Sequence, residues 1–178
     1  SEVETVAELI KDVNRRIREE VEEVKRRIEE LNDRNRKIAE EVKERIRRVE
    51  DEIREARKRG ESEERAKRLL EELRKIVKEV MRRVTESNRR LEETVRRVVE
   101  RLKRLNDTLR DIVRRLVKGD ELLTRIDRLV KDSERSSRKL VRELEELVRR
   151  SEEETEKLVR ELERLVTEVA RKVDEEAT

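Results

Sequence analysis

Apolar residues recur at steps of three and four along the first third of the chain, and charged residues fill the positions between them. Such steps keep apolar side chains on one face of an α-helix, whereas a strand would need a period of two. Two extra steps of four, at residues 13–21 and 38–46, raise the mean step to about 3.57 residues, which predicts a shallow left-handed, coiled-coil-like supercoil. The stripe consists of Val3, Val6, Ile10, Val13, Ile17, Val21, Val24, Ile28, Leu31, Ile38, Val42, Ile46, Val49, Ile53 and Ala56.

The same spacing continues through the rest of the chain, but the apolar stripe is broader because neighbouring residues are often both apolar. A helix that packs against two neighbours needs about three apolar positions in seven. We therefore predict that these stretches are helices of one bundle. Their apolar pairs are Leu69-Leu70, Ile76-Val77, Val80-Met81, Val98-Val99, Ile112-Val113, Leu129-Val130, Leu140-Val141, Leu147-Val148, Leu158-Val159 and Leu165-Val166.

Gly60 and Gly119 are the two glycines of the chain, and they divide it into three nearly equal parts. Glycine is favoured just past a helix C-terminus because it adopts the left-handed conformation without a steric penalty. Links of one to three residues force consecutive helices to be antiparallel. The sequence therefore predicts an all-α protein, a long up-down-up three-helix bundle that forms a single domain over residues 1–178.

Start signals accompany these stop signals. Ser62 and Asp120 are expected to cap the helices that follow them, and Ser1 with Glu4 has the spacing of a capping box. The predicted helices cover about residues 2–59, 62–118 and 120–177.

Uncharged polar residues fall at matching heights when the chain is folded at its glycines. Folding at Gly60 places Asn14 level with Asn106, and Asn32 level with Asn88. Buried amides and hydroxyls at one height can satisfy one another, whereas an unpaired one costs roughly 1–3 kcal/mol. The alternative is that these residues lie on the surface, although Glu, Arg and Lys fill most surface positions. We predict two structural polar layers, one of Asn14, Asn106, Ser133, Ser136 and Ser137, and one of Asn32, Asn35, Thr85, Ser87, Asn88, Ser151 and Thr155.

Composition excludes much of enzyme chemistry. Of 178 residues, 51 are Lys or Arg and 48 are Asp or Glu, and the sequence has no His, Cys or aromatic residue. It therefore lacks an imidazole base, a thiolate nucleophile and the usual zinc or iron ligands. Neighbouring carboxylates such as Glu22-Glu23 lie beside cations one turn away, as in solvated ion pairs. We predict no catalytic residue, no metal and no cofactor.

The sequence also argues against a membrane protein. It contains no run of about 18 apolar residues, and charge alternates with apolar residues from the start, so we expect neither a membrane span nor a signal peptide. Amphipathic helices can lie on lipid, but the aromatic anchors typical of that mode are missing. We expect a soluble chain whose localisation the sequence does not indicate.

Nucleic-acid binding is a remote alternative. The segment between the two glycines, residues 61–118, holds 19 basic and 12 acidic residues, including Arg82-Arg83, Arg89-Arg90, Arg96-Arg97 and Lys103-Arg104 at heptad spacing. Such a stripe could follow phosphates, but acidic residues are interleaved and no aromatic residue is available for base stacking. Charge complementarity with a neutral first helix and an acidic third helix is the simpler interpretation.

Homo-oligomerisation is the closer alternative. The broad stripes of the second and third helices could bury their flanking Val residues against a second copy, which would give a six-helix dimer. In a monomer the same residues would close the edges of the core. Patterning alone does not decide between the two, and it does not give the handedness of the three-helix turn.

Taken together, the sequence resembles computationally designed helical bundles that carry buried hydrogen-bond networks. The resemblance covers all 178 residues and rests on Gly60 and Gly119 as loop markers, Glu/Arg/Lys surfaces, Leu/Val/Ile stripes and polar clusters at common heights. It implies high stability, a role as a structural scaffold and no natural partner.

Overall fold

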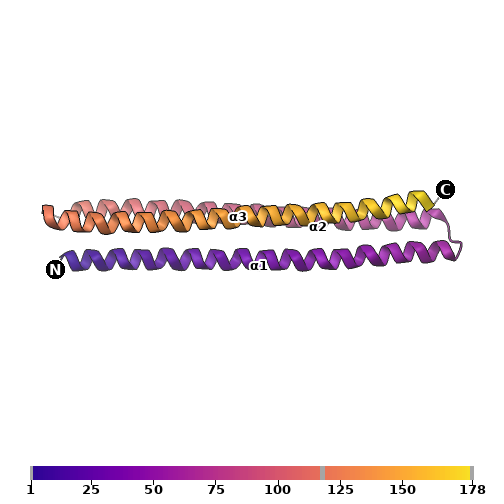
Figure 1. The fold of residues 1–178 in the computed structure, drawn as a ribbon, viewed down its shortest axis with the longest axis horizontal. Coiled ribbons are helices and arrows are strands. Elements are labelled where there is room, and N and C mark those ends of the chain that lie inside the picture. Colours follow the sequence, from indigo (N-terminus) through magenta and orange to yellow (C-terminus); the bar gives the residue numbers. More distant parts are fainter. Residues whose placement is uncertain (1, 117–118, 177–178) are drawn as a thin grey trace. The chain divides into compact units, whose positions relative to one another are not determined.

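Three long α-helices make up the computed structural model, which describes residues 2–116 and 119–176, with side chains for 4–116 and 124–175. α1 covers Glu2–Lys58, α2 covers Glu63–Leu116 and α3 covers Asp120–Glu176 (Figure 1). The predicted all-α, three-helix fold is confirmed, and the ends differ from prediction by one or two residues where they are described. The supercoil and its hand stay predictions.

The turn after α1 follows from Gly60, whose φ of +73° lies in the left-handed region. The amide of Gly60 donates to the carbonyl of Arg57 (3.1 Å), and the amide of Glu61 donates to the carbonyl of Ala56 (3.0 Å). These two bonds form a Schellman motif, which satisfies carbonyl groups that the helix end leaves free. A Cβ on Gly60 would meet no atom within 4 Å, so the backbone conformation and not space requires glycine here.

The second turn also depends on a glycine with positive φ, since Gly119 has a φ of +126°. Ser62 directly precedes α2, and its carbonyl accepts a hydrogen bond from the amide of Arg65 (3.1 Å). Ser62 thus occupies the predicted N-cap position. The predicted caps at Ser1 and Asp120 lie outside the described side chains.

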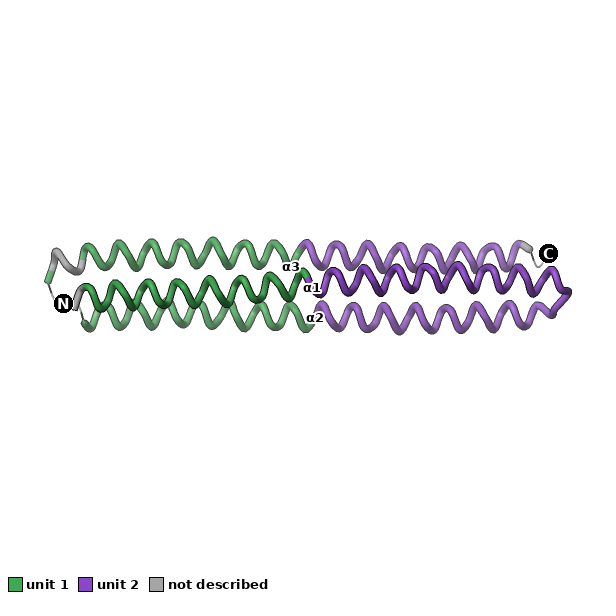
Figure 2. Tube along the Cα trace, turned by 90° about the horizontal axis from the view of Figure 1, so that it is seen from below, with its two compact units in different colours: residues 1–29, 90–149 green, residues 30–89, 150–178 purple. Residues whose placement is uncertain are grey.

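The chain divides into two compact units, each of which contains one segment of every helix (Figure 2). Unit 1 comprises Ser1–Glu29 and Arg90–Arg149, and unit 2 comprises Glu30–Arg89 and Arg150–Thr178. Each unit has its own apolar core, and in each the three helix segments pack together. A single domain over 1–178 stays a prediction.

The core of each unit is built from the predicted stripes. In unit 1, Ile126 is fully buried among Val6, Ile10, Leu109 and Val130. In unit 2, a larger cluster surrounds the fully buried Leu73 and includes Val42, Ile46, Val77, Leu162 and Val169. Burying one such side chain stabilises the folded state by roughly 1.5–3 kcal/mol. The 3.6-residue period brings these apolar side chains to one face of each helix, and their burial there is the main driving force for folding.

Candidate functional site

A serine of α3 is hydrogen-bonded to an asparagine of α1 in unit 1. The Oγ of Ser133 donates to the Oδ1 of Asn14. Ser133 is 2% exposed, while Asn14 is half-buried. The apolar residues of the unit 1 core lie one turn away, so this bond satisfies polar groups that would otherwise be buried without a partner.

Unit 2 contains an equivalent pair. The Oγ of Ser151, which is 1% exposed, donates to the Oδ1 of Asn32 at 2.6 Å. Both serine–asparagine pairs join residues 119 positions apart. A second contact in each unit, Lys25–Glu143 in unit 1 and Arg36–Glu154 in unit 2, has nearly the same separation of 118. Residue numbers therefore rise together along α1 and α3 in each unit, and the two helices run parallel there, as an up-down-up chain requires.

The other members of the predicted layers are distributed unevenly. Asn35, Asn88, Ser137 and Thr155 are buried, and Asn106 and Ser87 are half-buried. Three amide atoms are buried without a hydrogen-bond partner: Nδ2 of Asn35, Oδ1 of Asn88 and Oδ1 of Asn106.

Two predicted members are exposed, and their assignment to buried layers is wrong. Ser136 and Thr85 lie at the predicted heights, but each is rotated about 100° around its helix from a buried neighbour, Ser137 and Val84 respectively. Matching height is therefore not sufficient for burial, because the direction of the side chain around the helix axis also decides it.

Sequence reasoning missed a buried carboxylate. The side chain of Glu134 is 10% exposed, and its Oε1 accepts hydrogen bonds from both Nε (2.9 Å) and Nη2 of Arg110. Arg138 adds an ion pair one turn away at 3.7 Å. A signal was present, because Glu134 lies four residues after Val130 and seven before Val141 and so shares their face of the helix.

Arg57 is a second residue whose role was missed. Its place in the last turn of α1 suits the negative end of the helix dipole, but its contacts go further. Its Nη2 donates to Glu63 Oε2 (2.9 Å) and to the carbonyl of Val173 (2.5 Å), so it joins the end of α1 to both α2 and α3. The hydrogen bond and positive charge of Arg57 lower the pKa of Glu63.

Ion pairs also join α1 to α3 beside the polar pairs. Lys25 Nζ lies 3.0 Å from Glu143 Oε2, and Arg36 Nε lies 2.5 Å from Glu154 Oε1; each pair is 118 positions apart. The hydrogen bond from Lys25, together with its charge, lowers the pKa of Glu143. The same hydrogen bond raises the pKa of Lys25.

The Lys25–Glu143 pair should make stability depend on pH at both extremes. A carboxyl with a lowered pKa stabilises the fold above its ordinary value of 4.5, and an ammonium with a raised pKa does so below 10.5. A double-mutant cycle with Lys25→Met and Glu143→Gln should give about 0.2–1 kcal/mol at neutral pH, since Glu143 is 41% exposed and screened by water. Denaturant unfolding should show this coupling vanish in acid, once the pH has fallen below the lowered pKa of Glu143 and its carboxylate is protonated. A coupling that persists in acid would show that it does not come from the charges of Lys25 and Glu143.

Removing the hydroxyl of Ser133 tests the polar pair directly. Ser133→Ala leaves the Oδ1 of Asn14 without its donor, and we expect a loss of about 1 kcal/mol in the free energy of unfolding, because Asn14 is only half-buried. Ser136→Ala, three residues away and exposed, should change it by less than about 0.5 kcal/mol. If guanidinium titrations give both variants the same loss in the free energy of unfolding, the hydrogen bond between Ser133 and Asn14 does not contribute to stability.

The basic residues of α2 are partly neutralised by their own helix. Arg82 bonds Glu79 through Nε (3.2 Å) and Nη2 (2.7 Å), and Arg89 bonds Glu86 in the same way. The hydrogen bond from Arg82 lowers the pKa of Glu79. These pairs weaken the field that a phosphate backbone would meet on this part of α2.

The described residues also bear on metal binding and on membrane insertion. No group of three or more His, Cys, Asp or Glu side chains there could hold a metal ion. Nor is any helix, over the residues that the structure describes, apolar enough along its length to cross a membrane.

Comparisons with known proteins place the fold. No protein-family model matches the chain, and no curated protein matches it. Among solved structures, it is similar to one described as a "Computationally designed three helix bundle", with a TM-score of 0.57 and 22% sequence identity, over 98% of this chain and 82% of that one. At this identity the likeness shows the fold alone. The predicted resemblance to a designed helical bundle is thus matched by three long, mutually packed helices with buried Ser–Asn hydrogen bonds.

Proposed function

We propose that the chain is a designed structural scaffold without a natural biochemical function or catalytic activity, in which buried polar pairs set the register of the helices. One observation carries the proposal: in both units a serine of α3 donates to an asparagine of α1 at the same separation of 119 residues. An apolar stripe with a heptad-like period tolerates a slip of seven residues at little cost. A slipped helix would leave both pairs unbonded, so the pairs penalise every register except one.

Cysteine cross-linking tests this register, and the chain has no native cysteine to interfere. The variant Lys25→Cys/Glu143→Cys places two thiols where an ion pair of 3.0 Å now lies. The control Lys25→Cys/Ser136→Cys moves one thiol by a heptad along α3. A short bismaleimide should join the first pair readily and the second poorly.

The same measurement is then repeated without the polar pairs. Replacing Asn14, Ser133, Asn32 and Ser151 with Val should raise the yield of the heptad-shifted product or of cross-links between chains. If both backgrounds give the same products in the same yields, the polar pairs do not set the register and the proposal fails.

A homodimer is the second candidate for the form of this scaffold. Leu129 of α3 is 37% exposed, and Leu140, Leu147 and Leu158 are only half-buried. A second copy could cover these side chains, which the core of one chain leaves accessible. Sedimentation equilibrium distinguishes a mass of 21.7 kDa from one twice as large. A single species at the lower mass at all concentrations would exclude the dimer.

A further inference from the structure

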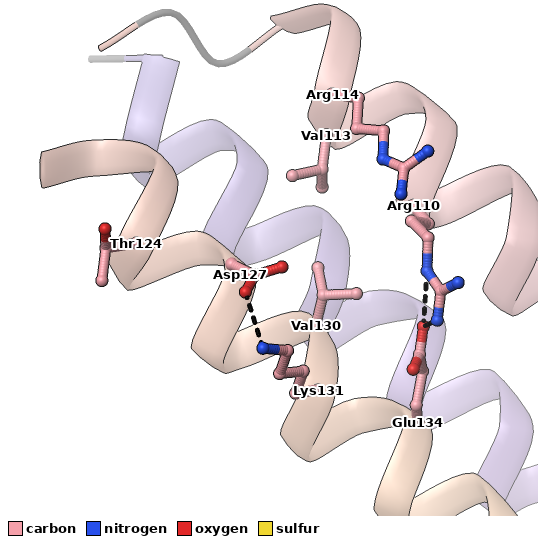
Figure 3. Close-up of a pocket in the computed structure, with 8 residues that line it drawn as sticks. All are labelled: Arg110, Val113, Arg114, Thr124, Asp127, Val130, Lys131 and Glu134. Atoms are coloured by element: carbon pink, nitrogen blue, oxygen red, sulfur yellow. Dashed lines mark hydrogen bonds and ion pairs between the residues drawn. The ribbon is translucent and has the colours of Figure 1, made fainter. Parts of the chain in front are cut away.

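Two hollows follow one another along the seam between α2 and α3 in unit 1, and Lys131 and Glu134 line both. Their volumes are about 530 and 630 Å³. In the first hollow Arg110 bonds Glu134 (Figure 3). The Nζ of Lys131 lies 3.1 Å from the Oδ2 of Asp127, so the charges that line this hollow largely compensate one another. The second hollow differs in charge, and we call it the basic hollow.

The basic hollow is lined mainly by cations. Among the described residues, five cations and one carboxylate line it, and two of the cations already have ion-pair partners. The other three are exposed and form no ion pair within the part of the chain that the structure describes: Lys103, Arg135 and Arg142. The carboxylate, that of Glu134, is already bonded to Arg110. The lining side chains therefore leave positive charge without compensation, which favours an anionic occupant.

A buried hydroxyl lines the same hollow. Ser137 is 3% exposed and forms no hydrogen bond with any residue whose side chain is described. Ser133, one turn earlier on α3, instead donates to Asn14. A hydroxyl can donate one hydrogen bond, and an anion in the hollow would supply the acceptor that Ser137 does not have in the protein.

Neighbouring acidic residues restrict the shape of the ligand. On α2, the exposed Glu100 and Asp107 lie about one turn to either side of Lys103, and neither lines the hollow. A linear polyanion that followed α2 would meet a carboxylate on both sides of this lysine. Arg135 and Arg142 are two turns apart on α3, about 10 Å along the helix, so a compact ligand can reach both. Guanidinium groups match the oxygens of phosphate in charge and in geometry.

We propose that the basic hollow binds a compact polyphosphate, a small molecule that carries several phosphate groups. Arg135 and Arg142 donate to its oxygens from α3, and Lys103 donates from α2. The hydroxyl of Ser137 donates to a further oxygen. Such binding goes beyond the role of a scaffold, and it does not depend on the polar pairs that set the register.

Calorimetric titration of the full chain with inorganic tripolyphosphate tests this site. An ionic strength of about 0.02 M keeps screening weak, because exposed charges are largely screened beyond about 10 Å at 0.1 M salt. We expect saturable binding of one molecule per chain. The variant Lys103→Gln/Arg135→Gln/Arg142→Gln should lose at least tenfold in affinity.

Two controls separate this site from the general charge of the protein. Arg16→Gln/Arg18→Gln/Arg26→Gln removes the same charge from exposed positions of α1 in the same unit, and it should lose less than threefold. Ser137→Ala keeps the net charge and should weaken binding about threefold, because one hydrogen bond is lost. Ser136→Ala, at the exposed neighbouring position, should leave the affinity unchanged.

Four results would overturn the proposal. The first is no saturable binding up to about 1 mM tripolyphosphate. The second is an equal loss in the two triple variants, since the ligand would then respond only to the net charge of the chain. The third is an unchanged affinity in Ser137→Ala. The fourth is tighter binding of an oligothymidylate of equal charge than of tripolyphosphate, since a linear polyanion would then be the better occupant.

Discussion

Leu144→Ala should be among the most destabilising single changes in this chain, lowering the free energy of unfolding by about 3 kcal/mol. The side chain of Leu144 is fully buried in unit 1. Truncation removes apolar contacts and leaves a cavity, because long helices held by many neighbouring contacts cannot collapse into the space. Guanidinium unfolding followed by circular dichroism measures the loss.

Leu129→Ala provides the matched control for this prediction. Leu129 lies on the same helix and in the same unit but is 37% exposed. The substitution is chemically identical, and we expect it to cost less than about 1 kcal/mol, since water already reaches the side chain. If the two variants lose the same stability, burial along the α3 stripe is not what holds unit 1 together.

Helix existence and relative height could be predicted because both follow from position along the chain. The rise per residue is fixed, so the two glycines set which residues lie level. Folding at Gly60 and Gly119 implies a shift of 118 residues between α1 and α3, and the Lys25–Glu143 and Arg36–Glu154 pairs show this shift. Local rules about glycine and caps were sufficient for this part of the fold.

Hydrogen-bond partners could not be predicted in the same way. Height placed Asn14 level with Asn106, but the bond of Asn14 is with Ser133, and the Oδ1 of Asn106 has no partner. Partner choice depends on side-chain direction around each helix axis and on the rotamer, neither of which the residue number determines. Glu134 was missed for a related reason: composition assigns a glutamate to the surface, whereas Arg110 allows this one to be buried.

Replacing both Asn35 and Asn88 with leucine should raise the free energy of unfolding or leave it nearly unchanged. Nδ2 of Asn35 and Oδ1 of Asn88 are buried without hydrogen-bond partners, and each such group costs roughly 1–3 kcal/mol. Leucine branches at Cγ as asparagine does, so it fills a similar space with apolar atoms. The gain in stability should come with lower specificity, because polar groups that penalise alternative associations are lost. Light scattering after size exclusion should show a broader distribution of oligomers.

Asn32→Leu is the same substitution with the opposite expected sign. The Oδ1 of Asn32 accepts a hydrogen bond from Ser151 at 2.6 Å, so its removal leaves the hydroxyl of a serine that is 1% exposed without an acceptor. We expect a loss of about 1–3 kcal/mol, measured by guanidinium unfolding under the same conditions. The two results compare a bonded, half-buried amide with two unbonded, buried amides of the same unit. A large loss in Asn35→Leu/Asn88→Leu with one clean species would mean that these two amides hold unit 2 together.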